Sequence, residues 1–198
     1  DAYQSRGLGD VYKRQASEQK RPCWMAGGFT EQSQRFRPSS REEHVVQKAE
    51  EHFERTLITI RGELAGSVAA LEHPSDDEAL NYGEIFLRDN VPVMIYLLVK
   101  RRFSVVRQFL KVCLDLQSTS VQTRGVFPTS FVEENGELVA DYGQRSIGRI
   151  TSVDASLWWP ILCWIYVKHS GDKEFGRSPE VQRGLQLLLD LVLHPSFE

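Results

Sequence analysis

A single aspartate directly before a long apolar run is the residue best placed to do chemistry in this sequence. Asp154 stands in SVDASLWWPILCWIYV, and three tryptophans follow it within that run. A charged carboxylate beside so much apolar surface costs free energy unless it is paired, hydrogen-bonded or protonated. Asp154 is therefore either an acidic cap on the helix that this run predicts, or a carboxylic acid held there to transfer a proton.

The protonation state of Asp154 depends on opposing influences. The start of a helix favours the ionised form and lowers the pKa. Burial against Trp158 and Trp159, or a second carboxylate nearby, would raise the pKa, and an acid that works near neutral pH needs the raised value.

Three polar clusters precede predicted buried elements: NYGEIFLRDN at 81–90, TRGVFPTSF at 123–131 and DYGQRSIGRITSVD at 141–154. If the inner helices share a direction, these clusters surround one cavity that suits a polar ligand. Charged groups, neutral hydrogen-bonding groups and aromatic faces are all present to bind such a ligand. The candidate binding residues are Asn81, Tyr82, Arg88, Asp89, Gln144, Arg145, Arg149, Trp158 and Trp159.

The elements that must position these residues are mainly helices. An amphipathic pattern predicts a helix at 41–60, starting with a capping box formed by Ser40 and Glu43. Segments 91–99 and 157–167 are apolar all round, which predicts buried helices, while 103–116 and 181–193 each keep a polar face. Ser178 followed by Pro179 predicts the start of the last helix. The alternation favours a closed toroid of two concentric helical layers, with an open solenoid as the alternative.

The connection between residues 117 and 154 lacks a convincing helix. Asn135-Gly136 lies there between two alternating runs, which predicts a tight β-hairpin, either a lid or plain scaffold. Residues 66–82 are expected to form a loop.

The motifs LNYGEIFLRDNVP, GVFPTSF and YGQRSIGRITSVDASLWWP resemble those of the alkaline/neutral invertases of cyanobacteria and plants. The resemblance runs from about Phe53 to Glu198, with the motifs in the family's order. It implies an all-α fold, here a partial (α/α)6 barrel with a small β-hairpin insertion. It also implies hydrolysis of sucrose to glucose and fructose with inversion, without metal or cofactor. Asp154 would be the general acid, and the general base, a glutamate, would lie beyond Glu198.

The N-terminal region is expected to lie outside the folded domain. Residues 5–15, SRGLGDVYKRQ, match the in-frame translation of a transposase sequencing adapter, so 1–15 are interpreted as non-native. Residues 16–40 are polar and are expected to form a disordered arm, with Met25 a credible natural start. Residues 41–198 are then the truncated N-terminal part of the catalytic domain, which we expect to be inactive alone and to associate through uncovered apolar flanks.

Net charge, the length of the apolar runs and the spacing of cysteines and histidines limit the kinds of partner that the chain can have. A net charge of -3 gives no reason to expect nucleic acid or an anionic membrane. The longest apolar run, 157–167, is too short to span a bilayer. The cysteines and histidines form no metal-ligand pattern, so we expect a cytoplasmic protein without metal. The resemblance implies sucrose as the partner, and the full-length protein could be a homo-oligomer.

Simpler explanations stand beside these assignments. Arg88 and Asp89 could form a plain structural ion pair. One of Trp158 and Trp159 would belong to the core, because neighbouring residues on a helix face different directions. Trp164 is expected in the core. Two other functions remain open: a non-catalytic helical-hairpin scaffold, and a toroidal enzyme acting on another sugar.

Overall fold

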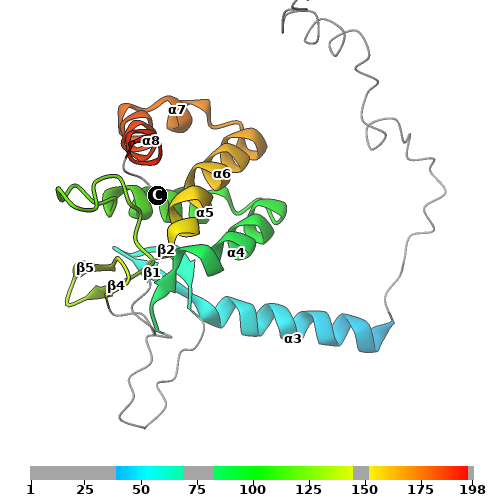
Figure 1. Ribbon diagram of the computed structural model, residues 1–198. Coiled ribbons are helices and arrows are strands. Elements are labelled where there is room, and N and C mark those ends of the chain that lie inside the picture. Colours follow the sequence, from blue (N-terminus) through cyan, green and yellow to red (C-terminus); the bar gives the residue numbers. More distant parts are fainter. Residues whose placement is uncertain (1–38, 69–82, 145–151, 196–198) are drawn as a thin grey trace, which may run out of the picture. The chain divides into compact units, whose positions relative to one another are not determined.

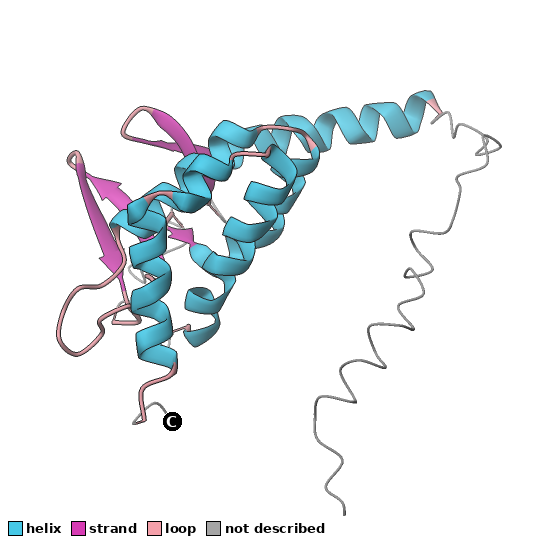
Figure 2. Ribbon diagram, turned by 90° about the horizontal axis from the view of Figure 1, so that it is seen from above, coloured by secondary structure: helices cyan, strands magenta, loops and turns pink. Residues whose placement is uncertain are grey.

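The computed structural model describes residues 39–68, 83–144 and 152–195 (Figure 1). The chain divides into two compact units, residues 1–46 and 47–198. The second unit contains the predicted site, and its described part is mostly helical with two small antiparallel sheets (Figure 2). This agrees with the expected helical class, although the strands amount to more than one hairpin.

The first described helix, α3, spans Ser40–Thr56. Its capping box is formed by Ser39 and Glu42: the Glu42 amide donates to Ser39 Oγ at 3.3 Å, and the Ser39 amide donates to Glu42 Oε2 at 2.6 Å. The predicted box at Ser40 and Glu43 was therefore wrong by one residue, because both positions offer the same side-chain chemistry.

The predicted helix extended to Ile60, and that end was also wrong. Residues Leu57–Ile60 form strand β1, which pairs antiparallel with β2, Glu63–Ser67. The turn between them has positive φ at Arg61 and Gly62, the backbone that a tight hairpin requires. Leu57 and Ile60 are buried in the strand just as they would be on a helix face, so their apolar spacing could not separate the two.

The second sheet contains the predicted hairpin. Strand β3, Ile85–Phe86, pairs with β4, Ser130–Glu134, which pairs with β5, Glu137–Asp141. Asn135 and Gly136 form the turn between β4 and β5 with φ of 53° and 83°. The hairpin prediction is confirmed. Because β4 also pairs with β3, the sheet joins the segment before α4 to the long connection before α6.

Five further helices lie in the described part of this unit. They are α4 Leu87–Val99, α5 Phe103–Asp115, α6 Val153–Ser170, α7 Lys173–Arg177 and α8 Pro179–Val192. Helix α5 packs against both α4 and α6, and α4 and α6 also contact each other. As predicted, α5 and α8 are amphipathic, and the Ser178 hydroxyl accepts from the Val181 amide with Pro179 at the first helical position.

The two all-round apolar helices are not fully buried, which corrects the prediction. Helix α4 exposes Ile95 and Val99, and α6 exposes a stripe of Leu157, Ile161 and Trp164 at helical spacing. Trp164 is 60% exposed, with Lys168 Nζ 4.7 Å from its ring centre, so its assignment to the core was wrong. The described part of the chain covers each of these helices on one side, and the apolar pattern does not reveal which side.

The core lies where α4, α5 and α6 meet one another and the two sheets, with Ile60 and Ala65 from the first sheet and Phe131 from the second. Its largest buried side chains include Phe109, Phe127, Phe131 and Trp159. Cys113 and Cys163 are free and buried within the helices, and burial raises the pKa of the Cys163 thiol to about 11. Both thiols therefore behave as small apolar side chains, as their positions predicted.

Candidate active site

Asp154 lies in the first turn of α6, directly after the N-cap residue Ser152 and Val153. The Ser152 hydroxyl does not cap the helix; it donates to Asp154 Oδ1 at 2.6 Å. The side chain of Asp154 is 47% exposed, so it is open to a ligand while its Oδ1 atom is held. Asp154 is therefore not the N-cap, and its neighbour fixes one of its two oxygens.

The pKa of the Asp154 carboxyl lies below its ordinary value. The main cause is the hydrogen bond from Ser152, which stabilises the carboxylate; partial burial acts in the opposite direction, and the charge of Arg88 lowers the pKa further. The carboxyl is thus ionised at neutral pH in this structure. Proton donation would require a further group that raises the pKa.

Arg88 connects the starts of two helices. It lies in the first turn of α4, with Nη1 3.7 Å from Asp154 Oδ1 and Nε 3.6 Å from Asp89 Oδ1. Its side chain is 58% exposed, so these are solvent-screened contacts rather than a buried ion pair. Arg88 does pair with Asp89, but it also reaches Asp154, which brings two of the three predicted polar clusters together.

The two neighbouring tryptophans have different surroundings. Trp159 is fully buried, donates from Nε1 to the Leu110 carbonyl at 3.0 Å and stacks on Phe127 with ring centres 4.7 Å apart. Trp158 is 36% exposed and follows Asp154 by four residues, which places the two on one face of α6. Trp159 is thus the core member of the pair, and Trp158 is the one available to a ligand.

The remaining predicted residues are only partly described. Gln144 is exposed, and its backbone amide donates to Asp141 Oδ1 at 2.7 Å. Asp89 is 64% exposed beside Arg88. Four predicted residues lie outside the described residues: Asn81, Tyr82, Arg145 and Arg149.

Several polar groups around these segments were not singled out from the sequence. Glu84 Oε2 accepts from the buried Ser130 hydroxyl at 2.5 Å. Asp141, at the end of β5, is buried, and its Oδ1 accepts from the amides of Gly143 and Gln144. The signal for Asp141 was its place at the end of the predicted hairpin, followed by Tyr-Gly. Ser152 offered only its position two residues before Asp154.

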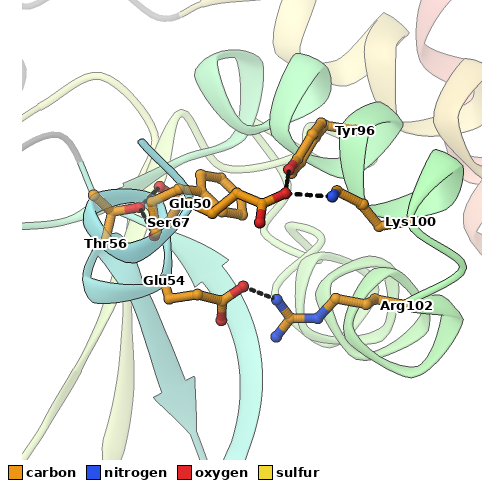
Figure 3. A network of polar contacts seen from close by, with 8 residues as sticks. Glu50, Glu54, Thr56, Ser67, Tyr96, Lys100 and Arg102 are labelled. Carbon is orange, nitrogen blue, oxygen red and sulfur yellow. Dashed lines mark hydrogen bonds and ion pairs between the residues drawn. The ribbon is translucent and has the colours of Figure 1, made fainter. Parts of the chain in front are cut away.

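A second polar cluster joins α3 to α4 and the turn after it (Figure 3). Glu50 pairs with Lys100 and Glu54 with Arg102, while Tyr96 packs edge-on against Phe53 with ring centres 5.1 Å apart. A cavity of about 460 Å³ lies among these residues. Both cations already face carboxylates, so we assign this cluster to holding α3 in place.

Within residues 39–68, 83–144 and 152–195, no group of three or more histidine, cysteine, aspartate or glutamate side chains could hold a metal ion. Over those same residues, no helix is both long enough and apolar enough to cross a bilayer.

Residues 49–198 match the alkaline and neutral invertase family. The chain belongs to this family. Asp154 and the segments around it lie well inside the matched residues.

Individual invertases are similar over most of this chain. Alkaline/neutral invertase CINV2 of Arabidopsis thaliana is 36% identical over 166 residues, covering 78% of this chain and 30% of the relative. Cytosolic invertase 1 of Oryza sativa subsp. japonica is 36% identical, with coverages of 78% and 29%. Neutral/alkaline invertase 1, mitochondrial, of the same rice is 34% identical, with coverages of 73% and 26%. This family member therefore spans under a third of the length of these relatives.

Proposed function

We propose that this chain is the N-terminal part of an enzyme that hydrolyses sucrose to glucose and fructose. The observation that carries the proposal is the ordered carboxylate of Asp154, held by Ser152 and facing Arg88 within the motif that matches the invertases. In the proposed reaction, Asp154 protonates the oxygen that joins the two sugars. A water molecule supplies the hydroxyl to the sugar carbon that is released from this oxygen.

We further propose that the reaction proceeds with inversion. Inversion requires a second carboxylate about 6.5–9.5 Å from the acid, which deprotonates the attacking water on the opposite face of the sugar. This base is proposed to be a glutamate that follows residue 198 in the longer enzyme. Its negative charge would also raise the pKa of Asp154. On this account the chain alone is inactive, since both the base and its effect on the acid are absent.

The proposed fold of the longer enzyme is an (α/α)6 barrel. Supporting it are the exposed apolar stripe of α6, Leu157, Ile161 and Trp164, and the exposed Ile95 and Val99 of α4. Apolar side chains at helical spacing indicate a face that is covered by further elements. Additional helices of the barrel would cover this face. Residues 41–198 are proposed to be its first part, with 1–15 foreign and 16–40 an arm.

The binding roles are proposed from the same geometry. Trp158 would present its ring to one sugar, and Arg88 would donate to hydroxyls while it holds Asp154. Gln144, Asp89 and the four predicted residues outside the described ranges complete the proposed set. We also propose a cytoplasmic location, consistent with the name of the rice cytosolic relative, although another relative is named as mitochondrial.

The test uses the chain extended to the length of its relatives. Purified enzyme is incubated with sucrose at neutral and mildly alkaline pH, and released glucose is measured. Wild type is expected to release glucose, and Asp154→Asn to lower kcat by about 10²- to 10⁴-fold, the usual contribution of a general acid. Asp190→Asn is the matched control, since Asp190 is an exposed carboxylate on α8 outside the proposed site. Hydrolysis of other disaccharides in preference to sucrose would overturn the substrate, and wild-type activity of Asp154→Asn would overturn the acid.

A further inference from the structure

Thr129 is a buried residue that contacts three separate parts of the chain. Its carbonyl accepts from the Leu87 amide at 3.0 Å, and its amide donates to the Asp141 carbonyl at 2.8 Å. Its Oγ1 accepts from the Ser152 amide at 3.3 Å. One residue of the segment before β4 thus holds the start of α4, the end of β5 and the start of α6.

Two of these contacts lie next to the candidate site. Leu87 directly precedes Arg88, and Ser152 both begins α6 and donates its hydroxyl to Asp154. The Arg88 and Asp154 side chains approach to 3.7 Å although they come from helices separated by more than fifty residues of sequence. Their separation therefore depends on how the starts of α4 and α6 are fixed relative to each other, and Thr129 bonds to both starts.

We propose that Thr129 is a positioning residue for Asp154 and Arg88. It sets the place of Asp154 through the Ser152 amide, and the place of Arg88 through the Leu87 amide. The inference rests on the proposed function only in naming Asp154 as the acid; the contacts themselves do not depend on it.

The side chain of Thr129 is the part that can be tested. Its two backbone bonds survive any substitution, whereas the bond to the Ser152 amide needs an oxygen at Oγ1. Valine keeps the branched shape and removes this oxygen, while serine keeps the oxygen. Loss of the acceptor leaves a helix-start amide unpaired and frees Ser152 to shift relative to Asp154. If Thr129 were only a buried β-branched residue, valine would serve as well as threonine.

The first experiment measures hydrogen exchange of the Ser152 amide in the 198-residue chain. Slow exchange is expected in wild type, with faster exchange in Thr129→Val and recovery in Thr129→Ser. Free exchange of this amide in wild type would overturn the proposal, and this result does not require any variant to fold.

The second experiment measures kcat, KM and the pH profile on sucrose in the longer enzyme. Thr129→Val is expected to lower kcat about tenfold and to leave KM within about twofold. The alkaline limb of the pH profile, where Asp154 loses its proton, is expected to move to higher pH, because the displaced Ser152 no longer stabilises the carboxylate. Thr129→Ser is expected to restore kcat and the limb. Thr123→Val is the matched control, since its hydroxyl contacts only Ser118 and Ser120 among the bonds described. An unchanged limb and kcat in Thr129→Val would overturn the positioning role. If wild type fails to cleave sucrose, the proposed function is wrong, and the exchange experiment still decides the role of Thr129.

Discussion

Replacing each of the two adjacent tryptophans by phenylalanine tests which of them belongs to the core and which to the candidate site. Trp159→Phe removes the bond from Nε1 to the Leu110 carbonyl and leaves part of the indole volume empty beside Phe127. The lost hydrogen bond costs about 1 kcal/mol. The cavity costs a further 1–2 kcal/mol or so, because a close-packed core relaxes only in part. The sum is a loss of about 2–3 kcal/mol in the free energy of unfolding.

Trp158→Phe is the matched control, because Trp158 is 36% exposed and has no hydrogen bond in the described structure. Its expected effect on stability is within about 0.5 kcal/mol, as for other surface substitutions. Urea unfolding of the chain, followed by circular dichroism, measures both values. In the longer enzyme, Trp158→Phe is expected to raise KM for sucrose more than Trp159→Phe does. Equal stability losses for the two variants would refute the assignment of Trp159 to the core and Trp158 to the site.

Three further predictions concern the pKa of Asp154, the self-association of the chain and the turn of the β4–β5 hairpin. Because the pKa of Asp154 is lower in the folded chain, its carboxylate stabilises the fold above the ordinary carboxyl pKa, and this stabilisation is lost as the pH falls through the folded pKa. Ser152→Ala should raise the pKa of Asp154 in an NMR titration. An unchanged pKa would contradict the Ser152 hydrogen bond as the main cause of the lowered value. The wild-type chain is expected to associate through the exposed stripe of α6, and the double substitution Ile161→Lys, Trp164→Lys should make it monomeric in light scattering. A monomeric wild type would contradict association through this stripe. Gly136→Ala should lower the free energy of unfolding by about 1 kcal/mol, since φ is 83° there, and an unaffected midpoint in thermal unfolding would contradict the turn geometry.

The sequence predicted those parts of the fold that have a local chemical cause. The Asn135-Gly136 turn needs positive φ, and the Ser178-Pro179 start needs a side-chain acceptor and a fixed φ, so both follow from residue type alone. The β1–β2 hairpin was missed because Leu57 and Ile60 fit a helix face and a strand equally well. Trp164 was misplaced because burial of an all-round apolar helix depends on neighbours that the pattern does not contain.

Some residues of the candidate site could also be predicted from the sequence, and others could not. Asp154 was predictable because a carboxylate beside apolar residues is unusual, and Arg88 because it stands among polar residues directly before an apolar run. Ser152 and Thr129 were not, since their contacts to the site use a hydroxyl and a backbone amide, which are common groups without a spacing of their own. Only the fold brings 87, 129 and 152 together.

The most direct test of the proton-donor role compares substrates that do and do not need a proton on the leaving group. Asp154→Asn in the longer enzyme is assayed on sucrose and on the glycosyl fluoride that wild type hydrolyses, because fluoride departs without protonation. A loss of about 10²- to 10⁴-fold on sucrose with little loss on the fluoride is the result we predict. Equal losses on both substrates would contradict it and would make Asp154 a structural residue instead of the acid.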